Sequence, residues 1–220
     1  MPSIKKIICL SNSWKHNERC IAGIDIDTGK WIRPVCDALY PEDGRIPAYI
    51  RFVEGREPKL LDILEIPLAD TGEDFGFESE NLSVLAGKWK CVGRVEPTDL
   101  LRYCGKLPQI LHNSWKYVNP SYLQGLPFHK RQTLQLVHSV TFFFKNGGYN
   151  NWRGTLQTLN GQYLRDAKIT DPVFVDKLNS GHQPKNNCLV TVSLSMPHKP
   201  SSEWQGEVPC WKLIAGVIEL

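Results

Sequence analysis

A stretch of 66 residues between Asp99 and Asp166 contains no acidic side chain, although it holds 8 Lys or Arg residues and 11 aromatic residues. The whole chain has 23 Asp and Glu in 220 residues, so about seven acids would be expected in a stretch of this length. Cations and aromatic rings without competing carboxylates are typical of surfaces that bind phosphates and stack on bases. A sheet with an aromatic buried face and a basic exposed face would give the same composition.

Inside this stretch, the segment FFFKNGGYNNWRGTL (142–156) predicts a turn at residues 146–148 with candidate binding side chains on both of its arms. These candidates are Phe143, Lys145, Tyr149, Trp152 and Arg153. Strand alternation puts Phe143 on the polar side of its strand, next to Lys145. The rings would stack on bases and the cations would contact phosphates. Docking onto a partner protein is the alternative for the same residues.

A second candidate surface is the segment CIAGIDIDTGKWIRPV (20–35), which predicts a strand, a tight turn and a strand. A two-residue turn at 28–29 would need a positive φ at Thr28, which is β-branched and resists that conformation. A three-residue loop over 27–29 needs a positive φ only at Gly29, where it costs little. The turn chemistry therefore favours the three-residue loop.

The three-residue loop decides which side chains of the two strands share a face. Its register pairs Ile24 with Ile32, so one face is expected to carry the three isoleucines Ile24, Ile26 and Ile32. Trp31 and Arg33 then share the other, exposed face, and Gly23 leaves space beside the arginine. In the alternative, Trp31 packs under the following loop and nearby aspartates neutralise Arg33, which would make the pair structural.

The second half of the chain predicts five strands, at 133–144, 150–159, 162–170, 187–195 and 210–219. A short helix is expected between the third and fourth strands, where Asp171 can cap, Pro172 suits the first turn and Gly181 suits the end. Five strands with one helix after the third are the layout of the OB-fold, a small Greek-key barrel.

The first half predicts a similar set of strands, at 4–11, 20–26, 30–35, 59–67 and 88–95. Its third and fourth strands are separated by a long loop, and a helix is expected after Pro97. The fold class is therefore expected to be mainly β, with two tandem small OB-like barrels and short helices. We expect a first domain over 1–105, a connecting segment over 106–130 and a second domain over 131–220.

The predicted barrels give two surfaces of the first domain a candidate role. In OB-folds the second and third strands meet the ligand, which is where Trp31 and Arg33 lie, and the loop before them extends the surface. In the segment NSWKHNERC (12–20) that loop carries Trp14, Lys15, His16 and Arg19. A solubilising loop is the alternative.

Signatures of catalysis are missing from the sequence. It contains no Walker loop, no GxGxxG, no GxSxG, no HExxH and no deaminase motif. Acidic residues do crowd the glycine-rich segment DTGEDFGFESEN (70–81), which predicts a solvated acidic loop rather than a rigid metal site. We therefore expect a non-catalytic protein, with a metal-dependent nuclease as a further alternative.

Cysteine spacing and hydropathy indicate where in the cell the protein is expected. The 7 cysteines have irregular spacing without a CxxC, so reduced thiols are expected, and neither a metal site nor a cofactor. No apolar run approaches the roughly 18 residues that a membrane span needs, and the N-terminus lacks a secretory signal. These patterns predict a cytoplasmic protein without a membrane partner.

The pattern SxxxKHxxRCIAGIDxDTGxWIRPV, from Ser11 to Val35, resembles the opening of the dual OB domain-containing proteins of bacteria and archaea. The segments LLDILEIPL (60–68), ITDP (169–172) and CWKLIAGVIE (210–219) are similar to other recurring blocks of that family. The resemblance implies two OB-folds in tandem. It also implies a role in nucleic-acid or nucleotide recognition, often beside prokaryotic defence components.

The resulting hypothesis is a tandem OB protein that binds nucleic acid, preferably single-stranded, or a nucleotide-derived ligand. The alternative is an adaptor whose exposed aromatic side chains dock an effector enzyme. These two hypotheses differ in their dependence on salt, because phosphate contacts weaken as salt rises and apolar docking does not.

Overall fold

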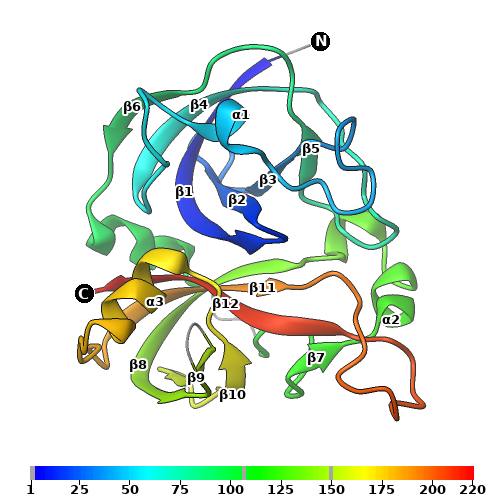
Figure 1. The fold of residues 1–220 in the computed structure, drawn as a ribbon, viewed down its shortest axis with the longest axis vertical. Coiled ribbons are helices and arrows are strands. Elements are labelled where there is room, and N and C mark those ends of the chain that lie inside the picture. Colours follow the sequence, from blue (N-terminus) through cyan, green and yellow to red (C-terminus); the bar gives the residue numbers. More distant parts are fainter. Residues whose placement is uncertain (1–2, 106–107, 149–150) are drawn as a thin grey trace. The chain divides into compact units, whose positions relative to one another are not determined.

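The computed structural model describes residues 3–105, 108–148 and 151–220 of the chain, except for the side chain of Phe143 (Figure 1). The chain forms two compact units, the first made of residues 1–75 and 80–100, the second of residues 76–79 and 101–220. Each unit contains a six-stranded sheet, so the mainly β prediction is confirmed. The domain division differs from the expected one, because the segment expected as a connector belongs to the second unit.

The first unit has the sheet order β5-β3-β2-β1-β4-β6. Its elements are β1 (Ser3–Lys15), β2 (Glu18–Asp25), β3 (Trp31–Val35), α1 (Ala48–Arg51), β4 (Asp62–Leu68), β5 (Asn81–Ser83) and β6 (Lys90–Arg94), followed by the 3-10 helix η1 (Pro97–Tyr103). β5 pairs parallel with β3 and β6 pairs antiparallel with β4. Together β5 and β6 therefore take the place of the fifth strand of an OB-fold, which is interrupted here.

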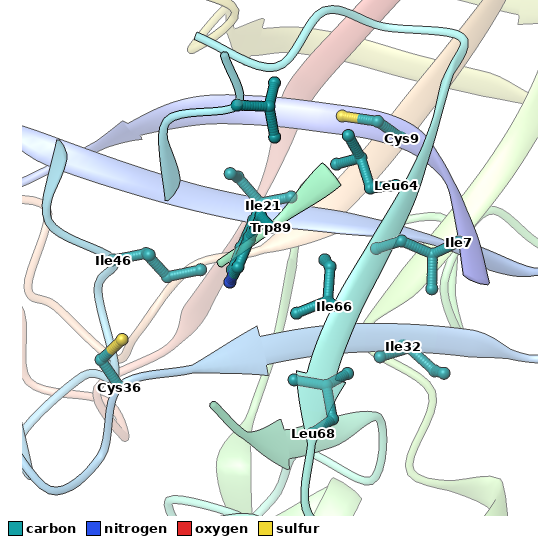
Figure 2. Close-up of a cluster of buried hydrophobic side chains, with 11 residues drawn as sticks. Ile7, Cys9, Ile21, Ile32, Cys36, Ile46, Leu64, Ile66, Leu68 and Trp89 are labelled. Atoms are coloured by element: carbon teal, nitrogen blue, oxygen red, sulfur yellow. The ribbon is translucent and has the colours of Figure 1, made fainter. Parts of the chain in front are cut away.

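Buried side chains fill the interior of this first barrel (Figure 2). On β4 burial alternates strictly, so Leu64, Ile66 and Leu68 point inward while the residues between them are partly exposed. Ile7 of β1 and the indole of Trp89 join them in the cluster. Burying such side chains stabilises the fold by about 1.5–3 kcal/mol each, so this cluster holds the strands together.

The second unit has the sheet order β10-β9-β8-β11-β12-β7. Its elements are β7 (Tyr117–Val118), α2 (Pro120–Gln124), η2 (Phe128–Lys130), β8 (Leu134–Asn146), β9 (Trp152–Thr158), β10 (Tyr163–Lys168), α3 (Pro172–Asn179), β11 (Cys188–Leu194) and β12 (Cys210–Glu219). A parallel bridge between Ile169 and Ile214 brings the end of β10 onto β12 and closes the barrel. The five predicted strands and the helix after the third are confirmed.

Capping explains why α3 begins where the sequence predicts. The carboxylate of Asp171 accepts a hydrogen bond from the backbone N–H of Phe174 at 3.1 Å, and Pro172 occupies the first turn. The other carboxylate oxygen accepts from the N–H of Val217 at 3.0 Å. The ring of Phe174 packs 6.0 Å from that of Phe142 on β8. Asp171 therefore joins α3 to β12 while its helix covers one end of the barrel core.

The β2–β3 hairpin does not have the predicted loop. Gly23 pairs with Ile32 and Ile24 with Trp31, which leaves a four-residue connection over 26–29 instead of three residues. Both carboxylate oxygens of Asp25 organise this connection, one accepting from the N–H of residue 27 at 3.0 Å and the other from the hydroxyl of residue 28 at 2.9 Å. Gly29 has the expected positive φ, +69°. The aspartate side chain therefore sets the loop length.

The shift by one residue changes the faces of the hairpin. Trp31 and Arg33 share a face as predicted, but Ile24 lies on that face too, while Ile32 joins the barrel core and Ile26 is exposed. The prediction that Arg33 is exposed is wrong, since only 1% of it is accessible, and Trp31 is half-buried. Space beside Gly23 is also lacking, because a Cβ there would lie 2.2 Å from a carbonyl oxygen of β1.

Candidate nucleic-acid interface

Three cations lie side by side across the second unit's sheet. Lys145 on β8 is directly opposite Arg153 on β9, and Arg153 is directly opposite Lys168 on β10. Residues paired in this way project from the same face with Cβ atoms about 4.5–5.5 Å apart. We call these three residues the cationic row. Like charges placed directly opposite one another destabilise a sheet, so the row requires a counter-charge.

Asp166 supplies that counter-charge from within β10. Its carboxylate lies 2.7 Å from Nζ of Lys145, 3.1 Å from Nε of Arg153 and 3.9 Å from Nζ of Lys116. Partial burial acts to raise the pKa of Asp166, but the hydrogen bond from Lys145 and the charge of Arg153 hold it below its ordinary value. Lys145, Arg153 and Lys116 thus share one carboxylate. With Lys168, the third member of the row, the four cations and Asp166 sum to a net charge of +3.

The backbone holds Asp166 in an unusual conformation. The β9–β10 register shifts between Leu164 and Ala167, and Asp166 in this bulge has a φ of +54°. Its N–H donates to the hydroxyl of Thr155 at 3.1 Å, and its carbonyl accepts from Arg153 at 2.8 Å. The bulge therefore aims the carboxylate at the cationic row while the main chain stays fixed.

An open pocket of about 170 Å³ lies at this position. It is lined by Phe144, Lys145, Arg153, Thr155 and Asp166. The Lys145 side chain is 67% exposed and that of Arg153 30%, so both cations reach solvent at the pocket. A pocket with this lining suits a small anionic group, since guanidinium and ammonium donors match phosphate oxygens.

An aromatic cluster of Trp115, Tyr117, Trp204 and Trp211 forms a second surface of the same unit. The ring centroid of Tyr117 lies 6.4 Å from that of Trp115, 5.9 Å from that of Trp204 and 5.5 Å from that of Trp211. The indole N–H groups of Trp204 and Trp211 donate to backbone carbonyls at 2.8 and 2.9 Å, which fixes both rings. Trp115 is 66% exposed. The cluster therefore offers fixed rings together with a solvent-facing one.

Lys116 joins the two surfaces. Its Nζ lies 5.6 Å from the centroid of the Trp211 ring, a cation–π distance, and 3.9 Å from the carboxylate of Asp166. β7 places this lysine beside the barrel by pairing Tyr117 with Trp211 of β12. Rings and cations are therefore adjacent at the second and third barrel strands and the β11–β12 loop, the part of an OB-fold that binds oligonucleotides or oligosaccharides.

Of the five candidates in 142–156, the structure brings Lys145 and Arg153 together in the pocket. Trp152 lies on the opposite face of β9 from Arg153, because consecutive strand residues alternate. Its indole N–H donates to Asn179 at 2.7 Å, and its ring packs 5.7 Å from Phe144. Tyr149 and the side chain of Phe143 are outside the described residues.

The candidates at the β1–β2 loop are held by their own unit. His16 lies in a two-residue turn with a φ of +48°, and its ring is 3.6 Å from the carboxylate of Asp43. The ammonium of Lys15 donates to the carbonyl of Asp43 at 2.5 Å. Arg19 lies 5.6 Å over the ring of Trp14, and its Nε is 4.0 Å from a carboxylate oxygen of Glu57. Both cations of this loop thus have oxygen partners within the fold.

Arg33 is likewise part of the first unit's interior. Its backbone N–H donates to the carbonyl of Glu80 at 2.8 Å, and its guanidinium donates to Asn81 at 3.5 Å. These partners come from the segment expected to be a solvated acidic loop. That expectation is wrong for its second half, because Glu78 and Glu80 are buried and β5 begins at Asn81.

Several site residues were missed by sequence reasoning. Lys116 and Tyr117 stand in the acid-free stretch, which is the signal that could have selected them. Asp166 ends that stretch, and Lys168 and Trp211 lie beyond it, so composition alone did not mark them. Within the described ranges, no group of three or more His, Cys, Asp or Glu could hold a metal ion.

Two further observations concern the helices and the cysteines. Among the described helices, none is long and apolar enough to cross a membrane. All seven cysteines are free thiols.

Comparison with known proteins identifies a family. A family model described as the dual OB-containing domain matches residues 5–217, whereas no curated protein and no solved structure gives a significant match. The matched range includes all but the outermost residues of the strands of both OB-like units, and both surfaces of the second unit. The chain therefore belongs to the dual OB-containing domain family.

Proposed function

We propose that this protein binds single-stranded nucleic acid, or a ligand derived from nucleotides, on the second unit, and that it does so without catalysis. The observation that carries the proposal is the position of Lys116 between the Trp211 ring and the Asp166 carboxylate. It makes a stacking surface and a phosphate-binding surface neighbours, which is the combination that single strands require. The setting expected from the resemblance, an accessory of a prokaryotic defence system in the cytoplasm, belongs to the same proposal.

The energetics of such a site divide between rings and cations. A base stacked on an aromatic side chain contributes about 1–3 kcal/mol, independent of sequence. Each neutralised phosphate of a single strand adds about −0.7 to the slope of log affinity against log salt. Lys116, Lys145, Arg153 and Lys168 would contact phosphates, so we expect a slope of about −2 to −3.

Fluorescence anisotropy with labelled single-stranded DNA and RNA tests the proposal. We expect binding at low salt that weakens as salt rises. The variant Trp211→Ala combined with Lys145→Met should lose most of the affinity. A matched control, Phe128→Ala combined with Lys130→Met, removes an exposed ring and an exposed cation on η2 and should bind like the wild type.

Two outcomes would overturn the proposal. Absence of binding to either nucleic acid at low salt removes it outright. Equal loss of affinity in the site variant and in the η2 control would show that the net charge of the unit matters and the site does not. Salt-insensitive capture of an effector enzyme, lost in Trp115→Ala, would favour the adaptor alternative instead, since Trp115 is the most exposed ring of the cluster.

A further inference from the structure

Asp166 holds a position that a residue with a side chain rarely adopts. A φ of +54° lies in the left-handed region, where residues other than glycine are uncommon and the backbone is strained. Such conformations persist when surrounding contacts hold them, and the bulge with its bonds to Thr155 and Arg153 does so here. The strain delivers a carboxylate to the cationic row, where the hairpin would otherwise carry only cations.

That carboxylate makes the contacts that a phosphate would make. It forms ion pairs with both cations of the pocket, lying 2.7 Å from Nζ of Lys145 and 3.1 Å from Nε of Arg153. Ammonium and guanidinium groups bind carboxylate and phosphate oxygens in the same way. The Asp166 side chain is 35% exposed at an open pocket, so an incoming anion can reach the same donors.

We propose that Asp166 is a built-in anion that occupies a phosphate site between Lys145 and Arg153, and that a phosphate-bearing ligand must displace it. This inference rests on the proposed function, since it assumes that such ligands bind this face. Displacement needs only rotation of the Asp166 side chain, because its backbone N–H and carbonyl are held by Thr155 and Arg153.

The consequence is a displacement cost that a ligand combining a phosphate with a base can offset by stacking. A free inorganic anion must compete with a tethered carboxylate and makes no further contact that would offset this cost. A nucleotide or single strand can also stack on the aromatic cluster, and this second contact offsets the displacement. Asp166 therefore lowers the affinity for every phosphate alike, and the stacking contact makes the difference between a nucleotide and free phosphate.

The test compares three proteins that carry matched changes of charge. Asp166→Asn removes the carboxylate and keeps a residue that tolerates positive φ, and Asp166→Gly removes it without any strain. Asp176→Asn is the control, because it removes one exposed carboxylate from α3 of the same unit. Circular dichroism establishes that each variant is folded before binding is measured.

Inorganic pyrophosphate, titrated by isothermal calorimetry, is the probe that reports on the site alone. Both Asp166 variants should bind it roughly two- to fivefold more tightly than the wild type, the effect of one surface ion-pair contact. Asp176→Asn should not. Adding Lys145→Met to Asp166→Asn should abolish the gain. The inference is overturned if the Asp166 variants bind pyrophosphate no better than Asp176→Asn does.

The two proposals fail separately. If the wild type binds labelled oligonucleotides but the Asp166 variants gain no affinity for pyrophosphate, the built-in anion is refuted and the binding function stands. If the Asp166 variants gain pyrophosphate affinity while the wild type binds no oligonucleotide, the anion site stands and its assignment to nucleic acid falls.

Discussion

Arg51 in the first unit and Arg153 in the second are both held by carboxylates, yet the two arginines have opposite surroundings. The Arg51 side chain is 6% exposed and pairs with Glu18 at 2.5 Å and Glu57 at 2.6 Å, so two acids meet one cation. Arg153 reaches solvent and shares the single carboxylate of Asp166 with two lysines. The ratio of acids to cations, more than the presence of arginine, separates a structural network from a candidate binding surface.

The largest expected effect is the loss of the first unit's network. Arg51→Met leaves Glu18 and Glu57 without their shared cation and the carbonyl of Ile46 without its side-chain donor. Both glutamates are partly exposed, so we expect the free energy of unfolding to fall by about 2–3 kcal/mol, below the full cost for a buried pair. Urea denaturation measures it, and Arg153→Met should change stability by less than about 1 kcal/mol. Equal losses in the two variants would erase the contrast.

A buried cation without an acid provides the next comparison. The ammonium of Lys212 donates to the carbonyls of Ile110 at 2.5 Å and Asn113 at 2.6 Å. Lys212→Met leaves both carbonyls unsatisfied, so we expect the free energy of unfolding to fall by about 1–3 kcal/mol near neutral pH. Urea denaturation of the variant at neutral pH measures this loss.

The same lysine predicts a dependence on pH. Burial lowers the pKa of Lys212 to about 7, whereas a lysine in the unfolded chain keeps a pKa of about 10.4. Between these values the unfolded chain binds more protons, so this group makes the free energy of unfolding rise with pH. Unfolding measured from about pH 7 to about pH 9 should show a steeper rise in the wild type than in Lys212→Met. The same pH dependence in the wild type and in Lys212→Met would contradict a lowered pKa of Lys212.

One tryptophan from each unit can be used to test which unit binds the oligonucleotide. Trp211→Ala should weaken oligonucleotide binding by about 1–3 kcal/mol, or roughly tenfold, because it removes a stacking ring beside Lys116. Trp31→Ala in the half-buried β3 position should leave the affinity unchanged and lower the stability instead. Anisotropy titrations of both variants decide the matter. A larger loss in Trp31→Ala would move the binding surface to the first unit.

The smallest expected effect is a change in the salt dependence of oligonucleotide binding. Lys168→Met removes one exposed cation of the row, so the salt slope of oligonucleotide binding should become shallower by about 0.7. Lys15→Met, which removes a cation bound to the carbonyl of Asp43, should leave the slope as it is. Titrations at several salt concentrations give both slopes, and identical slopes in the two variants would count against the row.

Local signals explain which parts of the fold were predictable. The five barrel strands of the second unit and its helix α3 follow from strand alternation and from one helix cap, Asp171 with Pro172, all of which act within a few residues. The interrupted fifth strand of the first unit was not predictable in this way. β5 has three residues in an acidic segment and exists because it pairs parallel with the distant β3.

The β2–β3 hairpin and the candidate site also show that local features were predictable and contacts between distant residues were not. The β2–β3 loop was misjudged because the side chain of Asp25, and not only the residues within the turn, organises it. Lys145 and Arg153 were found because a tight turn makes them neighbours. Lys116 and Trp211 lie far apart in the sequence and meet through the β7–β12 pairing, which composition does not encode.

The two-residue strand β7 has a consequence for dissecting this protein. Trimming the chain to the five barrel strands that follow residue 131 would keep every strand of the OB layout. It would nevertheless remove β7, which carries Tyr117, together with the preceding Lys116. It would also bare the outer edge of β12 at Cys210 and Trp211. Unpaired strand edges promote association with other chains, so the minimal barrel should aggregate more readily. It should also lack part of the proposed binding surface.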